Sequence, residues 1–412
     1  MAETALQSSR PALLNIERYL ARSEASPMSY PGTSPIMIAD TPQLQLEIPS
    51  DALSQVWQQQ AFTTDGIHWQ AALNQASLKT LLPWVQSFAP NARIWANSAA
   101  LSSFWEVVNG GAIEFENQRL VVIPTAAIDD RELRVPQEWV DLPSWAGDYY
   151  LSVAVNLEDD EIQVLGYTTH QMLKQRAQYD PLDRTYSLDE ADLIPDTNVL
   201  WITRRLCPDE VLRSQLAPLP ALSLQQAENL LARLGTTDVV VPRLAIPFQQ
   251  WGALLEHGGW RQRLYQRRLG LPEQWSVQQW LQSGISTLAE QFGWGATEMQ
   301  SNLAWARGSE ISSQKALLRH LSIAGKPYEL RVFQKSDDVW RFELQSTSGA
   351  LIPGGFKLRL LLEDLMPFEN NEDVAMNAIE CLYLEVRLSP GDTLVWETEP
   401  LPENYDREIL CF

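Results

Sequence analysis

The sequence predicts a multidomain α+β protein. We expect an N-terminal α+β domain with a small antiparallel sheet, a helical middle region and a C-terminal antiparallel domain that is β-sandwich-like. The chain has 412 residues, more than one hydrophobic core usually serves. The period of its apolar residues also changes along the chain, from mixed to helical and then to strand-like. These two observations divide it into a flexible N-terminal arm (1–40) and domains over 41–205, 206–310 and 311–412.

The first domain should begin with two helices. Ser50 is a suitable N-cap for one of them, and a second is predicted over 68–82. Pro83 should end the second helix, because proline has no backbone N–H to donate.

Short strands and a hairpin should follow. The β-rich runs at 149–155 and 162–167 flank a polar connection, which is typical of a hairpin. A helix then opens at Thr168, with Gln171 placed to complete a capping box. Shorter strand-like runs lie at 112–115, 119–123 and 133–135.

The sequence predicts helices in the middle region. Ser223 and Gln226 form a capping box, an apolar stripe covers 224–234, and Gly235 suits the position after the helix. Further helices are predicted over 247–256, 259–269, 277–282 and 286–292.

In the last hundred residues, apolar and polar residues alternate as they do in β-strands. Turns rich in Gly, Pro and Asp separate the predicted strands, as in an antiparallel sandwich. The predicted strands are 316–323, 328–334, 339–345, 356–362, 382–388, 393–397 and 408–412.

Composition limits the function. Lys and Arg number 31 against 52 Asp and Glu, a net charge of −21, which repels nucleic acid and anionic lipid surfaces. Cys207, Cys381 and Cys411 form no metal or disulfide pattern. No apolar run is long enough to span a bilayer, and the N-terminus has no signal-peptide pattern. We therefore expect a cytoplasmic protein that neither inserts into membranes nor binds nucleic acid.

The sequence shows no recognised catalytic, nucleotide-binding or metal-binding motif. We therefore predict no catalytic residues, no metal and no cofactor. Among the four histidines, His170 is the one of interest, because it opens a predicted helix directly after a strand. An ordinary surface position in the first helical turn is the alternative for it.

Sixteen tryptophans suggest instead a protein that packs against others. Rigid aromatic residues mixed with Arg and Asp are the composition of protein-interaction hot spots. A small β core made of the same aromatic residues is the alternative. The candidate partner-binding residues in this region are Trp139, Trp145, Tyr149, Tyr167, His170, Tyr179, Asp180, Asp183, Arg184 and Tyr186.

A second candidate surface is a basic helix. Arg261, Arg263, Arg267 and Arg268 form the one local inversion of charge, and they could hold an acidic partner. On a helix Arg261 and Arg268 point nearly the same way, with Arg263 and Arg267 roughly opposite. The alternative is that these arginines bridge neighbouring Asp and Glu side chains.

The run from Val135 to Tyr150 is distinctive, and Gly166–His170, Tyr179–Tyr186 and Pro400–Leu410 continue its pattern. Together they resemble a cyanobacterial family catalogued only as domain of unknown function 1822, over nearly the whole chain from about residue 40. The resemblance brings no assigned site residues. It implies a cyanobacterial, cytoplasmic origin and, because such genes lie near sigma factors and caspase-like proteins, a signalling or stress-response role.

Three functions stay open from the sequence. The first is a non-enzymatic protein-interaction or regulatory scaffold whose partner and oligomeric state are unknown. The second is an unrecognised hydrolase that uses scattered carboxylates and His170. The third is a nucleic-acid regulator acting through the basic helix from Arg261 to Arg268.

Overall fold

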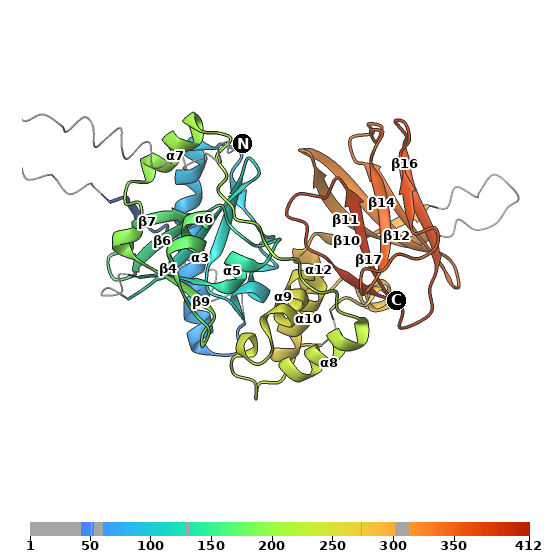
Figure 1. The fold of residues 1–412 in the computed structure, drawn as a ribbon. Coiled ribbons are helices and arrows are strands. Elements are labelled where there is room, and N and C mark those ends of the chain that lie inside the picture. Colours follow the sequence, from blue (N-terminus) through green and yellow to red (C-terminus); the bar gives the residue numbers. More distant parts are fainter. Residues whose placement is uncertain (1–42, 51, 53–60, 128–131, 273, 301–312) are drawn as a thin grey trace, which may run out of the picture. The chain divides into compact units, whose positions relative to one another are not determined.

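The computed structural model describes residues 43–50, 52, 61–127, 132–272, 274–300 and 313–412 (Figure 1). The chain forms two compact units. Unit 1 comprises Met1–Val56, Ala72–Arg93 and Asn109–Ala217, and unit 2 comprises Trp57–Ala71, Ile94–Val108 and Pro218–Phe412. The helices and antiparallel sheets confirm the α+β multidomain class, with its sheet-rich C-terminal region. The boundaries predicted after residues 40, 205 and 310 stay predictions. The arm over 1–40 and the helix after Ser50 lie outside the described residues.

A six-stranded sheet forms the centre of unit 1, in the order β1-β7-β6-β4-β3-β2. The hairpin β6–β7 is confirmed, and it has an antiparallel register. One detail differs from the expectation, because β4 and β6 pair in parallel, which makes the sheet mixed. The strands are β1 (Gln45–Glu47), β2 (Arg93–Ile94), β3 (Gly111–Phe115), β4 (Gln118–Thr125), β6 (Tyr149–Asn156) and β7 (Glu161–Thr169).

The long helix α3 (Asp65–Phe88) continues through Pro83 instead of ending there, so this prediction was wrong. Pro83 is exposed, and the carbonyl that loses its donor can therefore be served by water. Leu81 and Val85 continue the fully buried face on either side of it. Burial of that face outweighs the lost hydrogen bond.

A second, three-stranded sheet of unit 1 has the order β5-β9-β8. The helix expected at Thr168 is present but begins one residue later, because the side chain of Thr169, not Thr168, accepts the hydrogen bond from Met172 N. The elements of this part are β5 (Glu132–Pro136), α5 (Gln137–Asp141), α6 (His170–Arg176), β8 (Gln178–Asp180), β9 (Thr185–Asp189), η1 (Glu190–Asp192) and α7 (Thr197–Leu206).

Unit 2 contains the predicted helices. The capping box of Ser223 and Gln226 is present at the start of α8. The helices are α4 (Leu101–Trp105), α8 (Leu224–Leu234), η2 (Pro242–Leu244), α9 (Phe248–Glu256), α10 (Gly258–Arg268), α11 (Val277–Ser283) and α12 (Thr287–Gln291).

Gly235 has a different role from the one expected. Its φ of −73° is ordinary helical backbone, so it does not supply the left-handed conformation common after helices. A Cβ at this position would lie 2.8 Å from Cβ of Arg267 and 2.6 Å from O of Leu231. Glycine is therefore required because α10 approaches α8 closely here.

Two antiparallel sheets complete unit 2, in the orders β10-β11-β12-β13-β16 and β15-β14-β17-β18. All seven predicted strands are present. The ring of Phe412 lies 4.8 Å from that of Trp340 and 5.9 Å from that of Phe342, so the end of the second sheet packs on β13 of the first. The strands are β10 (Trp294–Gln300), β11 (Ser313–Ile323), β12 (Lys326–Ser336), β13 (Val339–Ser346), β14 (Lys357–Leu362), β15 (Glu372–Val374), β16 (Cys381–Arg387), β17 (Thr393–Glu399) and β18 (Ile409–Cys411).

Candidate functional site

The aromatic candidates of unit 1 lie in its core. Trp139, Trp145, Tyr149 and Tyr167 are each at most 3% exposed. The indole of Trp139 donates to Asn109 O at 2.8 Å, and its ring lies 5.3 Å from that of Trp145. These four residues fit the alternative of a β core, because a buried side chain offers no surface to a partner.

His170 is also fully buried, and both of its ring nitrogens are used. Nε2 lies 2.8 Å from Val140 O, and Nδ1 accepts a hydrogen bond of 3.1 Å from Ser214 N. Only the neutral tautomer that is protonated at Nε2 satisfies both partners. Burial lowers the pKa of His170 in agreement with this, against the raising effect of the Val140 carbonyl. His170 therefore ties α6 to backbone on both sides and has no nitrogen left to act as a base. Its burial contradicts both the candidate partner contact and the surface position that was the alternative for it.

The remaining candidates of this region lie on the β8–β9 hairpin. Tyr186 is buried and donates its hydroxyl hydrogen to Asp141 Oδ2 at 2.8 Å. Tyr179 is 38% exposed, and Asp180, Asp183 and Arg184 are half-buried. Tyr179, Asp180, Asp183 and Arg184 therefore lie at or near the surface, unlike the buried aromatic residues of the core.

The four arginines of α10 all form ion pairs within unit 2, as the alternative interpretation expected. Arg261 and Arg268 are 2% and 4% exposed, so they are not available to a partner. Arg267 is exposed. The pairs are Arg261–Asp406, Arg263–Glu363, Arg267–Glu228 and Arg268–Glu106.

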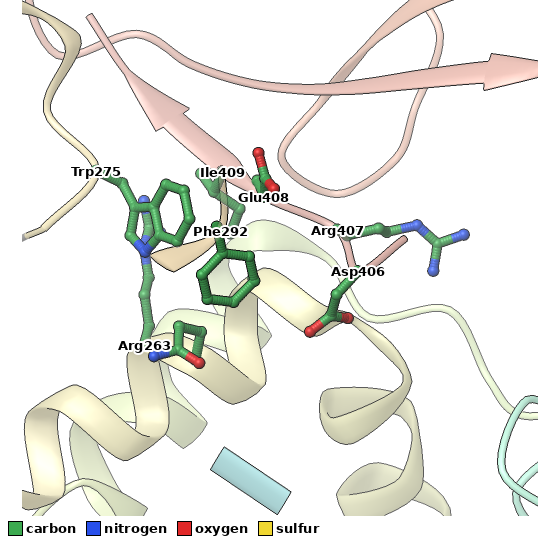
Figure 2. Close-up of a pocket in the computed structure, with 9 residues that line it drawn as sticks. Arg263, Trp275, Phe292, Asp406, Arg407, Glu408 and Ile409 are labelled. Atoms are coloured by element: carbon green, nitrogen blue, oxygen red, sulfur yellow. The ribbon is translucent and has the colours of Figure 1, made fainter. Parts of the chain in front are cut away.

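The start of α10 packs tightly against the start of β18 and the residues just before it. A Cβ on Gly259 would lie 2.4 Å from Cγ1 of Ile409. Figure 2 shows the narrow crevice between them, with Phe292 between Trp275 and Asp406. It has no room for a water molecule, so this crevice is a packing seam and not a ligand site.

A buried carboxylate that the sequence did not reveal borders this crevice. Glu408 is 1% exposed. Its Oε2 accepts hydrogen bonds from the indoles of Trp294 (2.7 Å) and Trp396 (3.1 Å), and its Oε1 accepts one from Arg319 Nε at 3.0 Å. Burial raises its pKa, and Arg319 opposes that shift. Because its acceptors are occupied by this framework, Glu408 joins β10, β11 and β17 and serves packing.

An open groove in unit 1 offers exposed apolar surface to a ligand. It has a volume of about 930 Å³ and lies between the end of α3, the β3–β4 turn and α7. Three exposed apolar side chains line it: Phe88 (44% exposed), Ile202 (54%) and Leu206 (68%). We call this the α7 groove. It was not predicted, because its parts lie far apart in the sequence.

Stacked rings hold the floor of the α7 groove. The rings of Phe88 and Trp201 lie 4.7 Å apart with an interplanar angle of 7°, and Trp84 and Phe115 meet the Trp201 ring edge-on or tilted at 5.7 and 5.5 Å. Such aromatic contacts favour this arrangement of the rings, by about 0.5–1.5 kcal/mol for each pair. The floor is therefore formed before a ligand arrives.

The charges of the α7 groove favour an anionic group. Arg204 pairs with Glu116 and lies over the Phe115 ring, 5.0 Å from its centroid. Arg205 is exposed, and within the described part of the chain no carboxylate pairs with it. Two polar atoms of lining residues, Trp201 Nε1 and Gln118 Oε1, are also buried without a partner there.

The chain belongs to the family described as Protein of unknown function (DUF1822), whose model matches residues 46–411. No curated protein and no solved structure matches it.

Two further findings concern the described residues alone. Their helices include none with the length and apolar character needed to cross a membrane. Their His, Cys, Asp and Glu side chains form no group of three or more that could hold a metal ion.

Proposed function

We propose that this protein is a non-enzymatic binding protein that holds a segment of a protein partner in the α7 groove. The observation that carries the proposal is the groove itself, where exposed Phe88, Ile202 and Leu206 surround a stacked aromatic floor. Soluble proteins rarely leave large apolar side chains gathered on the surface unless they bind something there.

The partner segment should carry apolar side chains and at least one carboxylate. Apolar side chains would cover Ile202 and Leu206, which lie four residues apart on one face of α7. A carboxylate would pair with Arg205, whose guanidinium has no partner in the described part of the chain and suits a two-pronged contact. Electrostatic complementarity of this kind gives specificity more than raw affinity.

The hydrolase alternative has less support. It requires His170 as a base, and both ring nitrogens of His170 are engaged with backbone groups at 2.8 and 3.1 Å. A general base needs a free nitrogen within reach of the proton that it abstracts. The cyanobacterial origin, the cytoplasmic location and the signalling or stress-response role remain parts of the binding proposal.

The test is affinity purification from the cell that makes the protein, with three forms of the full chain. The first is the wild type, and the second carries Ile202→Asp and Leu206→Asp in the groove. The third, a matched control, carries Leu182→Asp and Val211→Asp, which are exposed (84% and 70%) in the same unit outside the groove lining.

The wild type and the control should recover the same protein partner, and the groove variant should recover at least about tenfold less, which corresponds to a loss of about 1.4 kcal/mol of binding free energy. Arg205→Glu should also weaken recovery, with Arg176→Glu as the control for charge. Equal recovery by all forms would exclude the groove, and recovery of the chain alone would contradict the binding function.

A further inference from the structure

Unit 2 has a second open pocket, at one end of its two sheets. It is formed by Leu362 at the end of β14, the following loop 363–370, the end of β16, the start of β17, and Leu224 of α8. Its volume is about 630 Å³, within the range of peptide and small-ligand sites. We call it the acidic pocket, for the reason given below.

The walls of the acidic pocket are apolar and partly exposed. Leu224 and Leu362 are 45% and 42% exposed, Phe368 and Leu388 are half-buried, and Leu394 is buried. Nothing in the described residues covers these side chains further. Water in contact with such walls is released when an apolar ligand binds.

Carboxylates surround these walls. Five acidic residues and one arginine line the pocket. Two of the acids are neutralised, because Glu363 pairs with Arg263, and Glu385 with Lys335 and Arg341. The other three have no cationic partner among the described residues: Asp364, Glu369 and Asp392.

The arginine does not cancel this charge. Arg387 is 83% exposed in its side chain and lies 3.9 Å from Asp338, which is outside the pocket lining. The pocket therefore carries about three uncompensated negative charges beside an apolar wall. The α7 groove of unit 1 has the opposite sign, since its unpaired group is Arg205.

The pocket is also held in place. Backbone hydrogen bonds close the loop after β14, from Leu362 N to Met366 O (3.0 Å) and from Leu365 N to Leu362 O (2.8 Å). Asn371 Nδ2 donates to Leu360 O at 2.8 Å. Asp364 and Asp392 are oriented by hydrogen bonds from Met366 N and Ser389 N. A site formed in advance spends less binding energy on ordering.

We infer that the acidic pocket binds a basic, amphipathic peptide segment of a partner protein, in which Lys or Arg alternate with large apolar side chains. The apolar side chains would cover Leu224 and Leu362, and the cations would face Asp364, Glu369 and Asp392. This inference is independent of the α7 groove. If both hold, the chain has two sites of opposite charge for two different partners.

The experiment measures fluorescence anisotropy of a labelled peptide made of leucine and lysine, titrated with the purified full chain. A peptide of leucine and glutamate is the reference for charge. The Leu/Lys peptide should bind, and added salt should weaken its binding because exposed charges are screened. The Leu/Glu peptide should not use the acidic pocket: any binding of it to the α7 groove should be lost in the variant with Ile202→Asp and Leu206→Asp and unchanged when the charges of the acidic pocket are removed.

Because the whole chain is negatively charged, a cationic peptide could bind to it nonspecifically. Two matched variants distinguish such binding from binding in the acidic pocket. One triple variant removes the pocket charges: Asp364→Asn, Glu369→Gln and Asp392→Asn. The other removes three charges from the β6–β7 turn of unit 1: Glu158→Gln, Asp159→Asn and Asp160→Asn. Both have the same net charge.

The pocket variant should bind the Leu/Lys peptide roughly 3- to 100-fold more weakly, as expected for three exposed ion pairs. The turn variant should bind it like the wild type. Leu224→Ser should weaken binding as well, unlike Leu401→Ser, which changes an exposed leucine of unit 2 outside the pocket. Equal effects of the two triple variants, or binding of the Leu/Lys peptide that added salt leaves unchanged, would overturn the inference. The α7 groove lies in unit 1, so the variants of that groove test the proposed function separately, whatever the peptide experiment shows.

Discussion

Helix α10 allows a direct comparison of a buried and an exposed ion pair. Arg268 and Glu106 pair at 2.9 Å, and their side chains are 2% and 0% exposed. Arg267, the preceding residue, pairs with Glu228, and these side chains are 38% and 44% exposed. The change we consider is Glu106→Gln, with Glu228→Gln as its matched control. Each removes one carboxylate charge and little volume.

The two substitutions should differ greatly in effect. Glu106 also accepts hydrogen bonds from Thr63 N and Thr63 Oγ1, so its loss leaves a buried guanidinium charge and a weakened link to Thr63. Removing one partner of a buried pair costs about 3–5 kcal/mol. An exposed pair contributes about 0.2–1 kcal/mol. In the Glu106→Gln variant, Arg268 keeps its hydrogen bonds to the carbonyls of Leu234 and Val239. We therefore expect a destabilisation of about 3 kcal/mol, at the lower end of the range for a buried pair.

Differential scanning calorimetry measures the outcome. At about 2–4 °C per kcal/mol for a unit of this size, Glu106→Gln should lower the melting temperature of unit 2 by about 6–12 °C. Glu228→Gln should lower it by no more than about 4 °C. If the two variants melt within about 2 °C of each other, the reasoning about burial is refuted.

Three other predictions concern stability. Burial lowers the pKa of His257 to about 3, and nearby Arg407 acts in the same direction. As the pH falls, this histidine is therefore protonated in the unfolded chain before it is protonated in the folded protein. The free energy of unfolding should decrease below about pH 6.5, by about 1.4 kcal/mol for each pH unit. Urea unfolding at pH 7 and pH 5 should show a loss about 2 kcal/mol larger for the wild type than for His257→Gln, and parallel losses would contradict the shift. Gly235→Ala should lower the free energy of unfolding by about 1–3 kcal/mol, because the new Cβ would lie 2.8 Å from Cβ of Arg267. Gly295→Ala is the control, because a Cβ there has no atom within 4 Å. Equal thermal melts of the two variants would contradict the close packing of α8 on α10. Ser223→Ala removes the capping box of α8 and should cost about 0.5–2 kcal/mol, which the same melts can measure against Ser348→Ala in an exposed turn.

Local signals predicted most of the secondary structure. Strand alternation and turn residues gave all seven C-terminal strands, and the capping box of Ser223 located α8, because both signals depend on neighbouring residues alone. β15 was missed since three residues carry no period, and β10 was missed because its start at Trp294 follows directly on a helical region. The end placed at Pro83 was wrong because burial of α3 on both sides of it is a tertiary effect.

The candidate sites were harder to predict. Helical geometry correctly placed Arg261 and Arg268 on one face of α10. Their burial could not be predicted, because Asp406 and Glu106 lie 145 and 162 residues away in the sequence, and an unpaired arginine belongs at the surface. The α7 groove had one local signal, since Ile202 and Leu206 lie off the buried face of Leu200 and Thr203.

The interleaving of the two units has a consequence for synthesis. The segment Ile94–Val108 belongs to unit 2, and its helix α4 contacts α10. Phe104 and Trp105, which end 4% and 3% exposed, must therefore wait for some 160 further residues to leave the ribosome, roughly 10–30 s at usual translation speeds. Until then the two rings offer apolar surface to chaperones, and dividing the gene at any point between residues 105 and 258 would separate α4 from α10.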